Sequence, residues 1–249
     1  MTTAIRAVVF DLGGTLENVY YDDALRLKAT PGLRAILAQH DLDPGLSDAA
    51  LCALVITGIK QYGKWREETN LEKTPEQVFS EYVFTDLPRE RVVAIGEELA
   101  FYWDNHFSIR TARPETRAAI KQLRAQNFRL GVISNITSRR LVPFKLAEYG
   151  IRDDFEVVLS SCELGWRKPN PLIFLEMTRR LGLDASACAY VGDTISRDVV
   201  GAHRAGYGLA IQIKSFLTAH SDRETDVEPP DVIVQDLMQV MDVVNHQDR

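Results

Sequence analysis

The stretch Val8-Val9-Phe10-Asp11-Leu12-Gly13-Gly14-Thr15 decides the fold. The apolar run over residues 5–10 predicts a short buried strand, and an acidic side chain follows it directly. A buried carboxylate at a strand end is costly unless a cation or hydrogen bonds compensate for the lost water. The glycine pair allows a tight turn that approaches a phosphate, and Thr15 adds a hydroxyl beside Asp11. The same tract is also a common turn, so its meaning depends on the other segments.

The chain from residue 113 onward alternates strand-like and helix-like runs. We expect strands at 128–133, 155–159, 187–191, 208–212 and 231–234, helices at 115–126, 138–149, 171–181, 197–205 and 237–244, and a loop at 218–230. Such alternation predicts a parallel sheet with right-handed crossovers and a ligand crevice at the carboxyl ends of the strands. The predicted class is therefore α/β, with a Rossmann-like, doubly wound parallel sheet as the core.

Residues 17–112 contain helix formers rather than strand patterns. Thr30-Pro31-Gly32 and Leu87-Pro88 punctuate the region, and helix starts are expected at Ser47 and Thr74. We predict an inserted, all-helical cap domain over 17–112. The core domain would then comprise 1–16 and 113–249, with hinges near 17–21 and 108–113.

Composition narrows the class of protein. The 249 residues carry 29 Lys+Arg and 35 Asp+Glu, a formal charge of −6, which does not favour nucleic acid or an anionic membrane as a partner. Neither a long apolar run nor a secretory signal is evident. The three cysteines are far apart and the histidines show no zinc spacing, so a reduced, cytoplasmic protein without zinc is expected.

Three later segments offer the groups that Asp11 requires. Ser134 and Asn135 follow a predicted strand, where they either bind a phosphate at a helix N-terminus or simply cap that helix. Lys168 lies in a proline-flanked loop, where it either neutralises a phosphate and the nucleophile or forms a basic surface. Asp193 and Asp198 flank a turn after an apolar strand, where they either share a cation or cap a helix.

An aspartate can attack phosphorus to give an aspartyl-phosphate. The approach of two negatively charged groups requires a cation between them, and Mg²⁺ prefers oxygen ligands. The four segments together therefore predict metal-assisted phosphoryl transfer, with Asp11 as the nucleophile.

In their order along the chain, these segments resemble the four motifs of the haloacid dehalogenase-like (HAD) hydrolase superfamily, over residues 5 to about 213. The resemblance implies a Rossmann-like core, a helical cap between the first and second motifs, and dependence on Mg²⁺. It also implies roles for individual residues. Asp11, Ser134 and Lys168 would be catalytic; Thr15, Ser134, Asn135 and Lys168 would bind substrate; Asp11, Asp193, Asp198 and the backbone carbonyl of Gly13 would hold the metal.

The chain departs from this resemblance at Gly13, where phosphatases of the superfamily usually carry a second Asp that acts as general acid and base. Such help is worth about 10²–10⁴-fold in rate. A Mg²⁺-dependent phosphatase acting on a small phosphorylated metabolite, as a monomer or homodimer, is the first hypothesis, with Glu17, Asp22 or Asp23 as replacement acids.

Two other hypotheses follow from Gly13. One is phosphonatase chemistry through a Schiff base on Lys60 or Lys64, or dehalogenation, which Gly13 and the acidic pair disfavour. The other is a non-catalytic relative that binds a phosphorylated ligand or a partner protein. Candidate substrate contacts in the cap are Tyr62, Trp65, Arg66, Tyr102, Trp103, His106 and Arg110.

Overall fold

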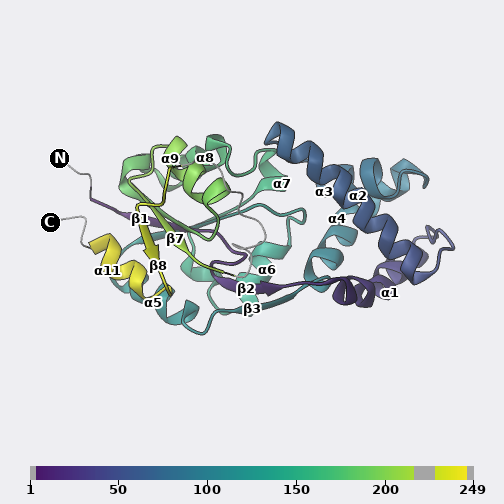
Figure 1. The fold of residues 1–249 in the computed structure, drawn as a ribbon, viewed down its shortest axis with the longest axis horizontal. Helices are drawn as coiled ribbons and strands as arrows, with labels where there is room; N and C mark the ends of the chain where they lie inside the picture. Colours follow the sequence, from purple (N-terminus) through teal and green to yellow (C-terminus); the bar gives the residue numbers. More distant parts are fainter. Residues whose placement is uncertain (1–3, 216–227, 246–249) are drawn as a thin grey trace.

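The computed structural model of the chain describes residues 4–215 and 228–245. Its centre is a six-stranded sheet in the order β5-β4-β1-β6-β7-β8, and every neighbouring pair is parallel (Figure 1). The strands are β1 Ala7–Phe10, β4 Arg129–Ser134, β5 Val157–Ser160, β6 Cys188–Gly192, β7 Leu209–Ile213 and β8 Val232–Val234. The predicted α/β class and parallel sheet are confirmed; the predicted loop at 218–230 lies mostly outside the described residues.

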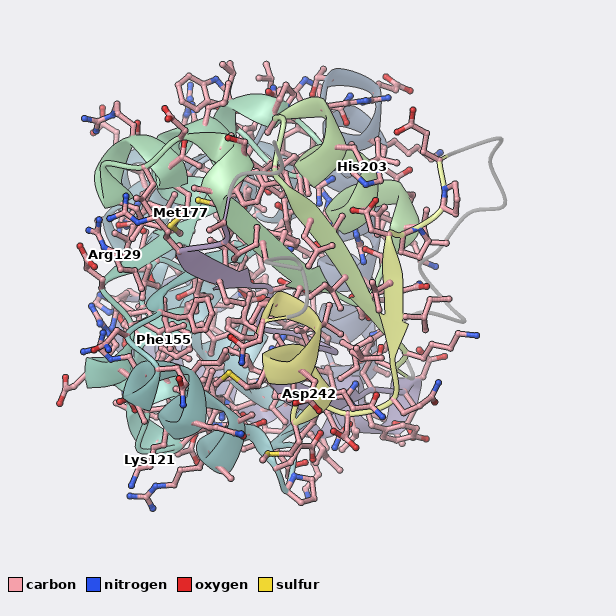
Figure 2. The ribbon with its side chains drawn as sticks, turned by 90° about the vertical axis from the view of Figure 1, so that its left-hand side faces the viewer. Lys121, Arg129, Phe155, Met177, His203 and Asp242 are labelled. Carbon is pink, nitrogen blue, oxygen red and sulfur yellow. The ribbon has the colours of Figure 1, made fainter. Side chains whose placement is uncertain are left out.

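Helices cover both faces of this sheet. Helices α5 (Thr116–Ala125), α6 (Leu141–Glu148) and α11 (Gln239–Asn245) pack on one face, where Phe10 and Phe155 lie in the same core. Helices α8 (Pro171–Leu181) and α9 (Val200–Arg204) pack on the other face, with Met177 in that core. Figure 2, which views the molecule from the end of the core, shows Phe155 and Met177 on opposite sides of the sheet. Successive side chains of β1 point to opposite faces of the sheet and pack in both cores, as a doubly wound sheet requires.

The order of the strands places β1 where the chain reverses its direction of winding. From β1 the chain crosses to β4 and β5 on one side, and then returns to β6, β7 and β8 on the other. In open α/β sheets the ligand crevice lies at this switch point, beyond the carboxyl ends of the strands. Residues that follow β1, β4 and β6 therefore meet there.

Residues 23–106 form a second body of helices with its own apolar core (Figure 1). It contains α1 (Asp23–Gln39), α2 (Asp48–Thr69), α3 (Pro75–Val78) with the π-helical turn Phe79–Val83, and α4 (Arg89–His106). Ser47 caps α2, and Thr74 with Gln77 forms a capping box on α3, so both predicted helix starts are confirmed.

Two features of this region differ from the sequence-based expectation. The segments predicted as hinges form antiparallel strands, β2 (Glu17–Tyr20) and β3 (Ile109–Ala112), so residues 17–112 are not all-helical. The expected break at Thr30-Pro31-Gly32 is also wrong, because α1 continues through Pro31. Packing explains this second difference. A side chain at Gly32 would collide with Tyr102, whose hydroxyl donates a hydrogen bond to the carbonyl of Ala29 and anchors the helix there.

The remaining short elements are 3₁₀ or π turns and one-turn helices around the core: Arg152–Asp154, α7 Ser161–Leu164, Ala185–Ala187 and Ile195–Val199. The last of these replaces the first turn of the helix predicted at 197–205. Among the described residues, none of the helices combines the length and apolar character needed to cross a membrane.

Candidate active site

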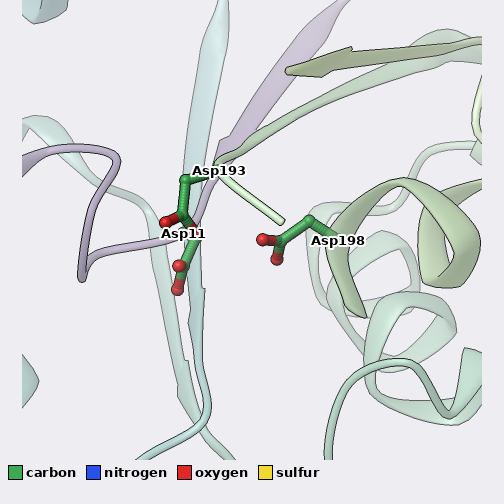
Figure 3. Close-up of side chains that lie close together, drawn as sticks. All are labelled: Asp11, Asp193 and Asp198. Carbon is green, nitrogen blue, oxygen red and sulfur yellow. The ribbon is translucent and has the colours of Figure 1, made fainter. Parts of the chain in front are cut away.

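Three buried carboxylates meet at the switch point of the sheet. Asp11 follows β1, Asp193 follows β6, and Asp198 lies in the π turn that precedes α9. One oxygen of each lies within 4.8 Å of the other two, and the three side chains point toward one another (Figure 3). The sheet thus brings together groups that are up to 187 residues apart, since 198 − 11 = 187.

Two glycines make room for this cluster. Gly14 has a φ of +86°, and a Cβ atom built there would lie 2.3 Å from an Asp193 carboxylate oxygen. A Cβ atom at Gly192 would lie 2.4 Å from the side chain of Asp198. Real Cβ atoms do not approach other atoms so closely, and a positive φ favours glycine. Both positions therefore require glycine for the carboxylates to stand where they do.

Lys168 forms the positive centre of the site. Its ammonium Nζ lies 2.8 Å from Asp11 Oδ1 and 2.7 Å from Asp198 Oδ1, and it donates to the Tyr190 hydroxyl at 3.0 Å. The backbone of Lys168 is fixed by Asn135, whose side chain accepts from the Lys168 N–H at 2.9 Å and donates to its carbonyl at 3.0 Å. A pair of backbone hydrogen bonds thus aims the lysine at the two acids.

Burial and mutual charge set the protonation of the carboxylates. Burial raises the pKa of Asp193 to about 7, and the charges of Asp198 and Asp11 add to this effect. Burial also raises the pKa of Asp11, although the charge of Lys168 opposes it. The pKa of Asp198 is lowered instead: burial alone would raise it, but the charges of Lys168 and Arg197 and the hydrogen bonds from Lys168 and the Thr194 N–H outweigh that effect.

These acids fit a hard divalent cation. Three carboxylates from separate segments supply an all-oxygen donor set, which suits Mg²⁺. Lys168 pairs with Asp11 and Asp198 only, and burial with the charges of those two acids raises the pKa of Asp193 to about 7. A divalent cation would favour its ionised form. Asp11, Asp193 and Asp198 would hold the ion; the role of the Gly13 carbonyl stays a prediction.

The other predicted site residues fall into two groups. Ser134 is 5% exposed at the end of β4 and lines the same cavity as Asp11, Gly13, Asn135 and Lys168. Thr15 is fully buried and does not line that cavity, and its hydroxyl has no hydrogen-bond partner in the part of the chain that the structure describes. The geometry therefore supports a substrate contact for Ser134 but not for Thr15.

The catalytic cavity, of about 150 Å³, is strongly basic. Its lining includes five cationic side chains: Arg66, Arg110, Arg167, Lys168 and Arg197. Sequence reasoning proposed Arg66, Arg110 and Lys168 but gave Arg167 and Arg197 no role. The signal was available, because Arg167 adjoins the predicted lysine and Arg197 adjoins the predicted metal ligand. Such a lining suits a phosphoryl dianion.

A second cavity, of about 290 Å³, adjoins the first on the side of the helical region. Arg66, Arg110, Asn135 and Ile136 line both cavities, so these residues stand between the two. This second cavity, called the cap cavity below, combines apolar walls with a few polar groups, the usual character of a small-molecule site. Its apolar walls come from Ile56, Ile59, Trp103 and Phe107.

Gly13 borders an ion pair rather than a replacement acid. A Cβ atom at this position would lie 3.9 Å from both the Arg110 guanidinium and the Glu17 carboxylate, which pair with each other. Glu17 is fully buried, also accepts from the Tyr149 hydroxyl at 2.6 Å, and does not line the catalytic cavity. The geometry makes Glu17 a positioning residue for Arg110, and does not support it as the missing acid.

Asp22 and Asp23, the other suggested acids, cap and flank the start of α1: Asp22 accepts from the Leu25 N–H, and Asp23 pairs with Arg26. Neither lines the catalytic cavity. Among the residues that the structure describes, Asp11 is therefore the only carboxyl group in the lining of the catalytic cavity.

Buried ionic contacts join the helical region to the core. Glu72 accepts from the Ser161 hydroxyl at 2.8 Å and pairs with Arg167 at 3.2 Å. Asp104, which is 7% exposed, accepts from the Ser138 N–H at 3.1 Å; burial raises its pKa to about 6, although Arg110 and Arg66 oppose that shift. These contacts hold the helical region against the core.

Of the seven cap candidates, only Arg66, Trp103 and Arg110 line a cavity of the site. Tyr62 is buried against Trp65 and donates to Glu72, while Tyr102 stacks on His106 at 4.2 Å. The latter four therefore serve the packing of the helical region. Of the two lysines considered for a Schiff base, Lys60 lines the cap cavity and Lys64 does not.

Comparison with known proteins agrees with this fold and site. The family model for haloacid dehalogenase-like hydrolases matches residues 5–206, which is most of the chain. The chain belongs to this family of hydrolases.

The individual relatives share between 25% and 32% sequence identity with this chain. A glyceraldehyde 3-phosphate phosphatase of Methanopyrus kandleri is 28% identical over 96% of this chain and 97% of its own. Another of that name, from Methanothermobacter thermautotrophicus, is 32% identical over 62% of this chain and 68% of its own. The solved structure of a 2-haloacid dehalogenase from Pseudomonas syringae pv. Tomato DC3000 is 25% identical, covers 97% of this chain and 99% of that one, and has a TM-score of 0.66.

Proposed function

We propose that this hydrolase is a Mg²⁺-dependent phosphatase that acts on a small phosphorylated metabolite. The observation that carries the proposal is the clustering of Asp11, Asp193 and Asp198, with Lys168 paired to Asp11 and Asp198 and with Asp11 and Lys168 lining a basic cavity. The names of the two archaeal relatives, both phosphatases, support the same reaction.

The residues divide the chemistry between them. Asp11 attacks phosphorus, so that a bond forms between its carboxylate oxygen and phosphorus while the bond to the leaving oxygen breaks. Ser134 and Lys168 hold the non-bridging oxygens, and Arg197 adds positive charge on the same side. A bound divalent ion would supply charge neutralisation between Asp11 and the phosphoryl oxygens.

The absence of an acid at Gly13 shapes the rest of the proposal. The leaving alkoxide takes its proton from water, because no lining carboxyl group besides Asp11 is available. A second water molecule then attacks phosphorus, the bond between Asp11 and phosphorus breaks, and phosphate leaves. The proton that this water loses neutralises the hydroxide formed in the first step. We expect slow turnover of poor leaving groups and faster turnover of good ones, such as p-nitrophenol.

The test is turnover of p-nitrophenyl phosphate by the wild type and by Asp11→Asn, each with Mg²⁺ and with chelator. The proposal expects turnover only in the wild type with Mg²⁺. Absence of Mg²⁺-dependent turnover, or equal turnover in the variant, would reject it.

Two other reactions have a specific observation behind them. The likeness to a named 2-haloacid dehalogenase favours dehalogenation, which predicts halide release from a 2-haloacid without metal. The place of Lys60 in the cap cavity favours Schiff-base chemistry, which predicts a borohydride-trapped adduct that Lys60→Gln abolishes. The cluster of three acids, two of them paired with Lys168, favours the phosphatase over both.

The division into domains belongs to this proposal too. Residues 17–112 would act as the cap, and 1–16 with 113–249 as the core. Separate apolar cores in the two regions support the division, and β2 with β3 would connect them. Slower limited proteolysis of the junctions on addition of Mg²⁺ and phosphate analogues would indicate closure of the cap.

A further inference from the structure

We propose that Arg66 binds a second acidic group of the substrate, so that the preferred substrates are small phosphomonoesters carrying a carboxylate or a second phosphate. The inference rests on the proposed phosphatase function, because the phosphoryl group must occupy the catalytic cavity beside Asp11. It adds the chemical class of the leaving group, which the reaction type leaves open.

The position of Arg66 is the first argument. Arg66 lies in α2 and lines both the catalytic cavity and the cap cavity. It also lines a third adjoining cavity, of about 180 Å³, together with Arg167 and Arg197. Arg66 is the residue that all three linings share. A ligand that extends from the phosphoryl site into the cap cavity would therefore lie beside Arg66.

The second argument is that Arg66 forms no ion pair with another described residue. Arg110 pairs with Glu17, and Arg167 pairs with Glu72. Arg66, by contrast, forms no ion pair within residues 4–215 and 228–245, and its buried Nε has no hydrogen-bond partner there. Its guanidinium carbon lies over the Tyr62 ring at 5.3 Å. Asp104 in the cap cavity feels the charge of Arg66 but forms no ion pair with it. A partly buried cation without a direct ion pair favours an anionic ligand, and the planar guanidinium suits a two-point contact with a carboxylate or phosphate.

The third argument is the character of the cap cavity. Four basic side chains line it, Arg26, Lys60, Arg66 and Arg110, against one acid, Asp104. Arg26 and Arg110 pair with acids outside that lining, Asp23 and Glu17, while Asp104 is bound by the Ser138 N–H. Its apolar walls and its volume of about 290 Å³ suit a short carbon chain. The cavity therefore matches a small acid rather than an uncharged sugar.

The experiment measures binding, so that it does not depend on turnover. Asp11→Asn serves as the parent, and calorimetry with Mg²⁺ gives the Kd of 2-phosphoglycolate, of the bisphosphate of 1,3-propanediol and of glycerol 3-phosphate, which has no second acidic group. We expect the parent to bind at least one of the two acids about 10- to 100-fold more tightly than glycerol 3-phosphate, the range of a charged hydrogen-bonded contact. The two acid arms distinguish a carboxylate from a second phosphate.

The matched variants add Arg66→Gln or Lys64→Gln to this parent. Lys64 lies on the exposed side of α2 and lines none of the three cavities. The quantity compared is the selectivity ratio, the Kd of glycerol 3-phosphate divided by the Kd of the acid that the parent binds more tightly. We expect Arg66→Gln to bring this ratio close to one, Arg66→Lys to give an intermediate ratio, and Lys64→Gln to keep the ratio of the parent.

The outcomes separate this inference from the phosphatase proposal. A selectivity ratio near one in the parent, or a ratio that Arg66→Gln leaves unchanged, overturns the role of Arg66. If the parent still binds the phosphate esters and the wild type still turns over p-nitrophenyl phosphate, the phosphatase proposal stands. Failure to bind any of the three phosphate esters, together with no Mg²⁺-dependent turnover in the wild type, overturns both.

Discussion

The substitution Gly14→Ala should damage the metal site far more than an ordinary added methyl group would. The new Cβ would lie 2.3 Å from Asp193 Oδ2, whereas ordinary contact begins near 3.4 Å, so the carboxylate must retreat by roughly 1 Å. A displacement of about 1 Å at a catalytic group costs about 10²-fold in rate. The φ of +86° adds about 1–2 kcal/mol of backbone strain for alanine.

Gly13→Ala is the matched comparison. Its Cβ would meet nothing closer than 3.8 Å, and Gly13 is not among the residues with positive φ. The assay is kcat/KM for p-nitrophenyl phosphate across a Mg²⁺ titration, with urea unfolding of each variant in chelator. We expect Gly14→Ala to fall about 10²-fold below Gly13→Ala and to require more Mg²⁺.

The reasoning would be refuted by a folded Gly14→Ala protein whose activity and Mg²⁺ requirement match those of Gly13→Ala. In that case Asp193 would not need its observed position for the reaction. A loss of folding in Gly14→Ala alone would be visible in the urea curves, and the Mg²⁺ titration would then be compared at a temperature where both variants are folded.

Three further perturbations test other parts of the account. Burial raises the pKa of Asp104 from 3.8 to about 6, so the folded wild type loses stability as the pH rises through this window. In urea unfolding, the free energy of unfolding of Asp104→Asn should therefore rise relative to that of the wild type by up to about 3 kcal/mol between pH 4 and 7. A difference that stays constant over this pH range would contradict this. Gly13→Asp would place a carboxyl group beside Arg110. We expect kcat to rise by about tenfold, which is less than the 10²–10⁴-fold that general acid–base help typically gives, because the arginine keeps that carboxyl ionised. An unchanged kcat would show that the missing acid does not limit the rate. Lys168→Met leaves two buried carboxylates without their cation, so the free energy of unfolding in chelator should fall by about 3–5 kcal/mol, and a loss below about 1 kcal/mol would argue against the ion pairs.

Sequence reasoning located the core elements because each carries a strong local signal. The apolar run before Asp11 and the Pro-opened helix at Pro171–Leu181 appear where they were predicted. The site followed from the same logic, since parallel strands must bring the groups after β1, β4 and β6 to one edge of the sheet.

The errors arose where tertiary packing outweighs local propensity. Pro31 stays inside α1 because the buried face of that helix packs against Tyr102 and its neighbours. The ribbon β2–β3 joins segments about ninety residues apart, and a pairing of such long range leaves little trace in either segment. Likewise, the ion pair of Glu17 with Arg110 shows only in three dimensions, and it converts a suggested acid into a positioning group.

The central claim is that Asp11, Asp193 and Asp198 hold one divalent cation between them. Binding of Mn²⁺, followed by electron paramagnetic resonance at neutral pH, tests it most directly. The account predicts one Mn²⁺ per wild-type chain, displaced by Mg²⁺, and an affinity at least about tenfold weaker in Asp193→Asn. Equal Mn²⁺ affinity in the wild type and in a folded Asp193→Asn protein would contradict it.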